Sequence, residues 1–134
     1  MHRDRYHAID PFVLLKAVGE DMDSFRRLSG TFLRIAPLTL ARLEETVAAN
    51  DSAIAALTVH SFKGTAALVG ANRLIKIIEA AEYLCKRGDI DSIAALLPAL
   101  TREFGAVMLE VQASIIDFDV SKSGDTSPLP GAPG

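Results

Sequence analysis

His60, Lys63 and Gly64 are the residues whose types and spacing favour chemistry. Residues three and four apart lie on one face of a helix, so these three share a surface. An imidazole is a nucleophile near neutral pH, because its unperturbed pKa is about 6.5. A nearby lysine supplies positive charge for phosphoryl oxygens, and a glycine one turn on leaves room for a partner's catalytic loop. The three residues therefore indicate an imidazole that accepts a bulky anion and presents it to another protein.

The helix that must position them is predicted over residues 52–69. At about 100° per residue, one side is apolar and faces the core. This core side consists of Ala55, Val59, Phe62, Ala66 and Val69. On the other side, beside His60 and Gly64, the residues predicted to dock a partner are Leu57, Ser61, Ala67, Leu68 and Ala71.

Each of these residues also has a purely structural interpretation. His60 could be an ordinary surface histidine, and Lys63 a solvated charge. Gly64 could allow close packing of two helices, since a glycine inside a helix costs about 1 kcal/mol relative to alanine and needs a reason. Leu57 and Leu68 could pack against a neighbouring helix instead of forming an exposed apolar rim.

Capping residues, prolines and glycines divide the rest of the chain into helices. The first is predicted from Pro11 to about Val18, and the second from a cap at Asp23 or Ser24 to about Asn50, kinked at Pro37. The third begins at Asp51 or Ser52 and stops at Gly70, and the fourth lies between a cap at Asn72 and Gly88. The fifth opens at Asp91 or Ser92 and runs through Ile115, with a bend near Pro98. An apolar stripe on the second helix is predicted to face the core: Phe25, Leu28, Phe32, Ile35, Leu38, Leu40, Leu43 and Val47.

Short connections between long helices make sequence neighbours antiparallel. The predicted fold is therefore all-α: an up-down antiparallel four-helix bundle with a short N-terminal capping helix. The bundle is expected over residues 10–118. Residues 1–9 are predicted to be a polar leader, and the Pro-, Gly- and Ser-rich residues 119–134 a flexible tail or linker.

Composition excludes several classes of function. With 134 residues and a formal net charge of −3, the chain lacks the basic patch of a nucleic-acid-binding protein. A single cysteine, Cys85, excludes an internal disulfide, and His2 and His7 lack acidic or cysteine partners at metal-ligand spacing. No uninterrupted apolar run approaches the roughly 18 residues of a membrane span, and residues 1–9 are polar and lack the apolar segment of a signal peptide. We therefore expect a cytoplasmic protein without direct membrane contact and without a metal.

The segment HSFKGTAALVGANRL, residues 60–74, resembles the signature of histidine-containing phosphotransfer (Hpt) domains. That signature is His-x-Leu-Lys-Gly-Ser, a small apolar stretch, Gly-Ala, and then Leu. The resemblance extends over about residues 9–115. This sequence has Phe62 where the family usually has leucine, and Ala81-Glu82 where it usually has Leu-Glu. Glu82 and Lys86 stand at positions where the family often places polar residues near the histidine, and the sequence assigns neither of them a role.

The resemblance implies a carrier in a two-component phosphorelay. His60 would take a phosphoryl group on Nε2 from the aspartyl phosphate of one response-regulator receiver domain and pass it to the aspartate of another. Lys63 would stabilise the phosphoryl group and Gly64 would give access to the ring. No cofactor and no autonomous catalysis are expected, because Mg²⁺ would lie on the partner receiver and no nucleotide-binding loop is present. The chain is expected to be a monomer that works with a hybrid sensor histidine kinase, or to be a module at the end of such a membrane-bound kinase.

Two other functions remain open at this point. A helical adaptor would dock receivers or kinases without being phosphorylated, but it would have no need for the imidazole of His60. A dimerisation and phosphoacceptor module of a histidine kinase carries His followed by Glu and assembles its bundle from two chains. Here Ser61 follows His60, and the chain has enough helices to close a bundle alone.

Overall fold

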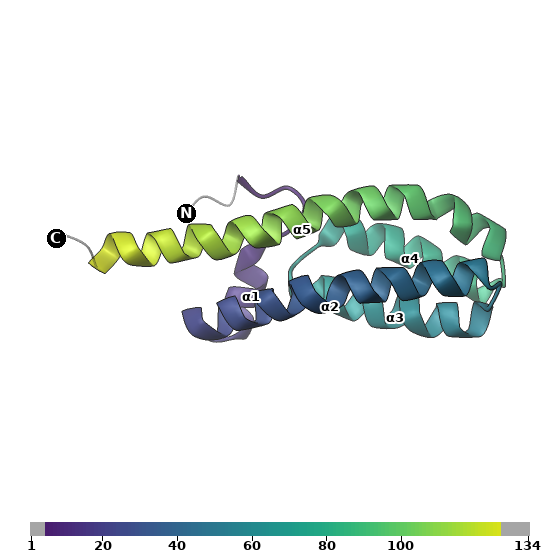
Figure 1. Cartoon of the computed structure of the whole chain (residues 1–134), viewed down its shortest axis with the longest axis horizontal. Helices are drawn as coiled ribbons and strands as arrows, with labels where there is room; N and C mark the ends of the chain where they lie inside the picture. Colours follow the sequence, from purple (N-terminus) through teal and green to yellow (C-terminus); the bar gives the residue numbers. More distant parts are fainter. Residues whose placement is uncertain (1–4, 127–134) are drawn as a thin grey trace.

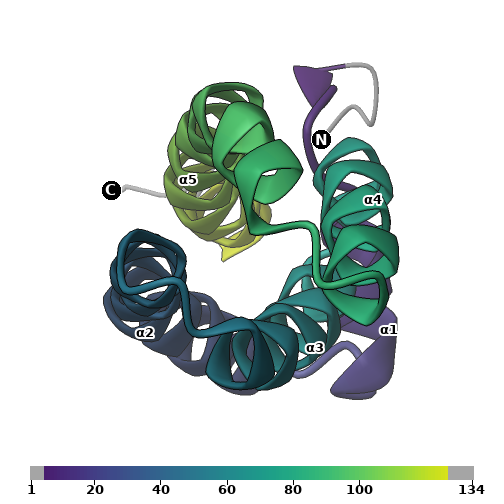
Figure 2. The same cartoon turned by 90° about the vertical axis from the view of Figure 1, so that its right-hand side faces the viewer.

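In a computed structural model of the protein, the backbone is described for residues 5–126 and the side chains for residues 5–118. This part forms five helices: α1 (Pro11–Ala17), α2 (Met22–Ala48), α3 (Ser52–Leu68), α4 (Asn72–Lys86) and α5 (Ile90–Thr126). Viewed end-on, the four long helices occupy the corners of a bundle, with α3 diagonally opposite α5 (Figure 2). The predicted all-α bundle with an N-terminal helix is confirmed.

The main core lies between the four long helices, and α3 contributes the side that the sequence predicted. Ala55, Val59, Phe62 and Ala66 of α3 and Val69 just beyond it are all buried. The ring of Phe62 packs edge-on against that of Phe104 in α5, with ring centroids 5.7 Å apart. Because this side of α3 faces the core, the residues on its opposite side face outward.

The caps of α2 and α5 lie earlier in the chain than predicted. Asp21 caps α2, because its carboxylate accepts the backbone N–H of Ser24 at 3.1 Å. Asp89 accepts the backbone N–H of Ser92 at 3.2 Å, and α5 begins at Ile90. Asn72 is the first residue of α4 and not its cap. In each acidic cap the carboxylate accepts the backbone N–H three residues on, so Asp21 and Asp89 cap these helices, and neither member of the two predicted pairs does.

Both prolines inside predicted helices leave the helix unbroken. Pro37 lies within α2 and Pro98 within α5, and each helix continues on both sides. Each proline removes one backbone hydrogen bond, and packing of the long helices against the core outweighs that loss.

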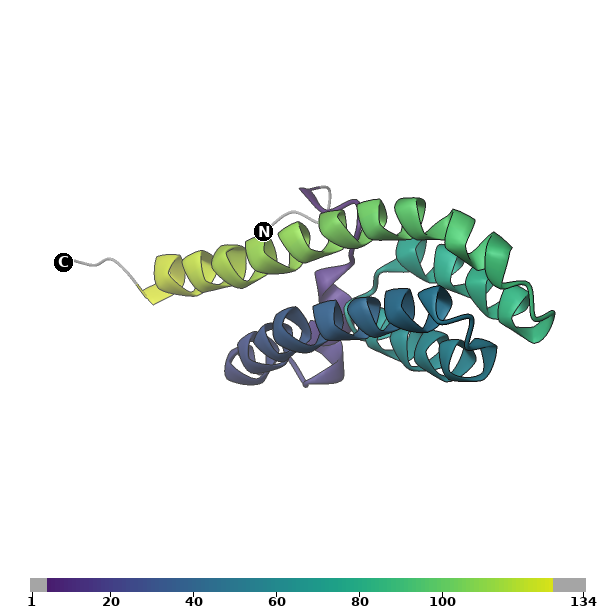
Figure 3. The same ribbon diagram turned by 45° about the vertical axis from the view of Figure 1, so that its right-hand side comes forward.

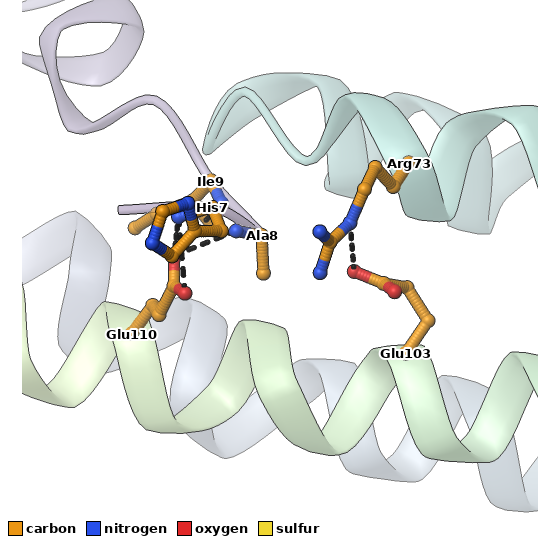
Figure 4. A network of polar contacts seen from close by, with 6 residues as sticks. All are labelled: His7, Ala8, Ile9, Arg73, Glu103 and Glu110. Atoms are coloured by element: carbon orange, nitrogen blue, oxygen red, sulfur yellow. Dashed lines mark hydrogen bonds and ion pairs between the residues drawn. The ribbon is translucent and has the colours of Figure 1, made fainter. Parts of the chain in front are cut away.

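The N-terminal segment is more than the polar leader that we predicted. Ala8 and Ile9 are buried, and the Glu110 carboxylate of α5 accepts the backbone N–H groups of His7, Ala8 and Ile9 at 2.8–3.1 Å (Figure 4). The same view shows the Arg73–Glu103 ion pair, which joins α4 to α5 at 3.2 Å.

Two more contacts hold this segment along α5. The Tyr6 hydroxyl donates a hydrogen bond to Asp117, which also pairs with Arg5. Residues 5–9 therefore form a strap along α5, which a count of polar residues in the sequence could not predict.

A second, smaller core holds the end of the bundle beyond the strap. α1 lies between the beginning of α2 and the later part of α5 (Figure 3). Here the ring of Phe118 stacks on that of Phe25 at 4.5 Å and tilts against that of Phe12 at 5.9 Å. With Phe118 anchored, α5 continues to Thr126 and projects past the other helices (Figure 1). The boundary predicted at residue 118 therefore falls inside a helix, and residues 127–134 of the predicted tail lie outside the described residues.

By length and composition, one helix of the described part could cross a membrane. It is the stretch Ile90–Phe118 of α5, with a mean hydropathy of 1.4. The mean hydropathy of an 18-residue window is therefore high in this stretch, although polar residues interrupt its apolar residues. Leu100, Phe104 and Val107 of this stretch are buried in the main core, and the core helix of a bundle passes the same test.

Gly70 ends α3 as predicted, and a close contact at this turn leads to a first prediction. Its φ is +66°, and an added Cβ would lie 2.8 Å from the backbone oxygen of Asp10. We expect Gly70→Ala to lower the free energy of unfolding by about 3 kcal/mol in urea denaturation, because left-handed strain and a backbone clash add. Gly88→Ala is the matched control, since φ is +68° there and nothing lies within 4 Å of the new Cβ. It should cost only about 1 kcal/mol; equal losses would disprove the role of the Asp10 contact.

Candidate functional site

His60 lies on the outward side of α3, and its side chain is 78% exposed. Asp51 caps the helix as one of the two predicted residues, accepting the backbone N–H of Ile54 at 3.1 Å. Core packing by Phe62 on the opposite side fixes how α3 is rotated about its axis. These local features together place the imidazole in solvent.

Glu82 of α4 contacts the imidazole from one side. Its Oε2 lies 3.4 Å from Nδ1 of His60, which is a long hydrogen bond. A carboxylate only accepts hydrogen bonds, so the contact favours the tautomer of His60 with its proton on Nδ1. That tautomer leaves a lone pair on Nε2, the nitrogen that Glu82 does not contact.

Lys63 is already paired in this structure. Its Nζ donates a hydrogen bond of 2.7 Å to Oε1 of Glu82. This bond is the largest cause of a raised pKa for Lys63 and of a lowered pKa for Glu82. Because the pKa of Glu82 is lowered, the pair breaks at the acidic end only when the pH falls through the pKa of Glu82. Because the pKa of Lys63 is raised, the pair breaks at the alkaline end only when the pH rises through the pKa of Lys63. The ion pair therefore persists across neutral pH.

Gly64 lies one turn after His60 with open space around it. An added Cβ would meet nothing within 4 Å, apart from the helix's own nearby backbone. No neighbouring helix approaches closely enough to require a glycine, so the packing interpretation fails. The missing side chain instead leaves the surface beside the imidazole unobstructed.

The predicted docking residues divide into two groups. Leu57, Ser61, Ala67 and Leu68 are exposed on the same side of α3 as His60. Ala71 is fully buried in the turn before α4, so its inclusion in the docking surface was wrong. The helical wheel failed there because α3 ends at Leu68, and residues beyond its end do not follow its periodicity.

On α2, two residues of the predicted core stripe instead face solvent. Ile35 is 41% exposed and Leu38 is 64% exposed. Ala36 and Leu40 are buried in the core instead. Ile35, Leu38 and Leu40 are three and then two residues apart, and side chains with that spacing do not share one face of a helix. Between α2 and α3 runs a groove of about 180 Å³, lined by Thr39, Arg42, Ile54, Leu57, Thr58 and Ser61.

Other candidate groups contribute nothing to this site. Within residues 5–118, no group of three or more His, Cys, Asp or Glu side chains could hold a metal ion. Cys85 is buried, as expected for a small apolar residue, and burial raises the pKa of its thiol. Lys86 is exposed on α4, and no contact in this part of the chain joins it to His60.

Glu82 contacts both His60 and Lys63, and sequence reasoning gave it no role. Its contact with His60 joins residues 22 apart, so no local motif reveals it. A signal exists nonetheless in the α3–α4 hairpin, which turns at Gly70. His60 lies ten residues before that glycine and Glu82 twelve residues after it, so an antiparallel pair brings them opposite each other.

Comparison with known proteins agrees with this geometry. The family model described as the Hpt domain matches residues 27–110, a range that includes His60, Lys63 and Glu82. The fold is similar to the crystal structure of histidine-containing phosphotransfer protein B (HptB) from Pseudomonas aeruginosa PAO1. The TM-score is 0.75 at 26% identity, over 82% of this chain and 96% of that one. A search of curated proteins gave no match. The chain belongs to the Hpt domain family and performs histidine phosphotransfer in a phosphorelay.

Proposed function

We propose that His60 is the phosphoacceptor of this chain, taking a phosphoryl group from one receiver domain and passing it to another. The observation that carries the proposal is an exposed imidazole whose Nδ1 side faces Glu82 and whose Nε2 is free to react. The Nε2 lone pair attacks phosphorus, the N–P bond forms, and the acyl P–O bond of the aspartyl phosphate breaks. The aspartate leaves as a carboxylate, and the reverse step phosphorylates a second receiver.

The neighbours of His60 have distinct roles in this proposal. Lys63 stabilises the phosphoryl oxygens as a point charge, moving from or sharing its contact with Glu82. Glu82 is a positioning residue: it holds the proton on Nδ1 and offsets the positive charge that the ring gains when Nε2 is phosphorylated. Gly64 lets the catalytic loop of the receiver reach the ring. Mg²⁺ belongs to the partner receiver, whose acidic pocket supplies the ligands.

Intact-mass analysis at neutral or alkaline pH tests this proposal. The chain is mixed with phosphorylated receiver domains from the same organism and analysed before and after acid treatment. We expect the gain of one phosphoryl group that acid removes. Binding to a receiver without any gain in mass would instead support the adaptor function.

We further propose that the chain acts as a cytoplasmic monomer. Support comes from the main core, which the helices of a single chain close without help. Sedimentation velocity should then give one species near the 14.3 kDa of the chain. A stable dimer at micromolar concentration would contradict this part of the proposal.

Glu82→Ala tests the positioning role directly. We expect transfer to His60 to slow about tenfold, by analogy with metal-bound histidines, where losing the partner that fixes the tautomer and the ring orientation costs at least about tenfold. The imidazole ¹⁵N shifts should also move toward the tautomer protonated on Nε2. A purely structural role for Glu82 would leave that tautomer signature unchanged.

Glu79→Ala is the matched control for this variant. Glu79 lies on α4 one turn before Glu82, is exposed, and makes no contact with His60 in the described part of the chain. Its loss should leave both the transfer rate and the tautomer unchanged. Equal slowing in the two variants would show that general negative charge, and not the Nδ1 contact, matters.

A further inference from the structure

The outward face of α5 carries almost no charge. The exposed residues of α5 between positions 94 and 116, which we call the α5 face, are Ala94, Ala95, Pro98, Thr101, Arg102, Gly105, Leu109, Gln112 and Ile116. Arg102 is the only charged residue among them, whereas most exposed residues of α4 are charged. A surface helix normally presents charged and polar residues to water, so the composition of the α5 face requires a reason.

Two large apolar side chains dominate the α5 face. Leu109 is 69% exposed and Ile116 is 62% exposed. They are seven residues apart, which is about two helical turns, so they lie on one stripe. The most apolar 18-residue window of α5 has a mean hydropathy of 1.4, yet only 22% of it is buried. The core therefore accounts for one side of this helix only, and exposed apolar surface of this kind marks an interaction site.

The large and small residues of the α5 face are separated along the helix. Leu109 and Ile116 lie in its second half, and the first half holds Ala94, Ala95, Pro98 and Gly105. An antiparallel second copy reverses this order, so that Leu109 of one copy lies opposite Gly105 of the other. Ile116 then lies opposite Pro98. Each large side chain thus meets a smaller one, which is how the surfaces of facing helices interdigitate.

The same alignment gives the one charge of the α5 face a partner. Arg102 of one copy lies opposite Gln112 of the other. The amide oxygen of a glutamine accepts hydrogen bonds, and a guanidinium donates them. These matches of size and polarity are properties of the face against itself, so they favour a second copy over an unrelated helix.

The length of α5 agrees with this alignment. The helix runs from Ile90 to Thr126, and its last turns project past the other helices (Figure 1). Leu109 and Gly105 lie on either side of a point close to the middle of the helix. An antiparallel second copy would therefore lay its first turns along the projecting turns. Because a short helical segment without packing is marginal in water, this contact gives the projecting turns a neighbour.

The size of the α5 face predicts a weak pair. α5 has 37 residues. Its length is therefore about 55 Å, and at a helix width of about 10 Å a pair would bury on the order of 550 Å² on each copy. A stable standard interface buries roughly 800 Å² on each partner. The chain alone is thus expected to stay monomeric at micromolar concentration and to pair at millimolar concentration, which a short flexible link between two copies also provides.

We propose that two copies of this chain pair weakly and antiparallel through their α5 faces. α3 lies diagonally opposite α5 in the bundle (Figure 2), so His60 of each copy stays accessible in the pair. Two copies held close together would therefore share an interface without covering either imidazole. The inference does not depend on the role of His60, because the α5 face and His60 lie on different sides of the bundle.

A dilution series of the ¹⁵N-labelled chain, from about 2 mM to about 0.05 mM, measures the pairing. We expect amide shifts that depend on concentration at Thr101, Gly105 and Gln112, with a dissociation constant near 1 mM, and none at Ser61 of α3. Shifts confined to α3 would overturn the inference. So would shifts that do not change up to the highest concentration, and the α5 face would then be left to a helix of another protein.

Leu109→Glu tests the contribution of the face itself. A carboxylate placed opposite Gly105 is buried without a partner, so the dissociation constant should rise at least about tenfold. Because Leu109 is exposed, helix content from circular dichroism should stay unchanged. Leu38→Glu is the matched control, since Leu38 is 64% exposed but lies on α2. It should leave the dissociation constant within about twofold; equal losses would show non-specific apolar association and overturn the inference.

Disulfide trapping tests the antiparallel alignment. Chains carrying Arg102→Cys and chains carrying Gln112→Cys are mixed at about 1 mM and oxidised with glutathione disulfide, and the products are separated by mass. Cys85 is buried, so the introduced thiols react first. We expect the mixed disulfide to form faster than either disulfide between identical chains. Faster linkage of identical chains would show a parallel pair and contradict the proposed alignment.

Discussion

His60→Gln is expected to abolish phosphorylation by every receiver while leaving the fold intact. Glutamine has no nucleophilic nitrogen, so the loss should be complete and not partial. The side chain is 78% exposed, and a substitution at such a position changes the free energy of unfolding by no more than about 0.5 kcal/mol. Helix content from circular dichroism and the melting temperature should therefore match those of the wild type.

His7→Gln is the natural control for this variant. His7 is exposed on the strap, and its backbone, not its ring, contacts Glu110. The His7→Gln chain should be phosphorylated to the same extent as the wild type. Phosphorylation of the His60→Gln chain would place the phosphoacceptor elsewhere, and a large loss of helix content would contradict the outward position of His60.

Substitutions at Gly64 are expected to separate stability from function. Nothing obstructs a Cβ there, and alanine is the better helix former, so Gly64→Ala should raise the free energy of unfolding by about 1 kcal/mol. The same methyl group stands beside the imidazole, so transfer should slow. Gly64→Glu adds bulk and a charge that repels the phosphoryl group, and we expect transfer to fall at least about a hundredfold, on the scale of a reacting group misplaced by 1 Å.

Thermal unfolding and single-turnover transfer are measured on the same Gly64 preparations. Gly105→Ala serves as the control, because Gly105 is exposed within α5 and also has open space around it. It should stabilise the chain similarly without slowing transfer. A Gly64→Glu chain that transfers at the wild-type rate would disprove the access role.

Local signals predicted α3, the helix that carries His60, well. The core side of α3, the cap at Asp51 and the stop at Gly70 all depend on residues within one or two turns of one another. Such features follow from periodicity and hydrogen bonding along the chain, so they can be read without knowing the neighbouring helices. The outward position of His60 follows from the same periodicity.

Features that depend on packing between distant segments were missed. The contact of Glu82 with His60 needs the register of α3 against α4, and the strap needs Glu110 of α5 to lie beside residues 7–9. The exposure of Leu38 depends on how α2 is rotated against the core, which Ala36 and Leu40 decide. In a bundle, small shifts in rotation and register change which side chains meet, and the sequence pattern alone fixes neither.

A relay between two receivers tests the central claim most directly. A donor receiver carrying labelled phosphate is mixed with an acceptor receiver, alone and then with either the wild-type chain or its His60→Gln variant. We predict that label reaches the acceptor only when the wild-type chain is present, and that the chain itself becomes labelled in passing. Transfer that proceeds equally well with the His60→Gln chain, or label that never leaves the donor although both receivers bind, would contradict the role of His60 as the carrier.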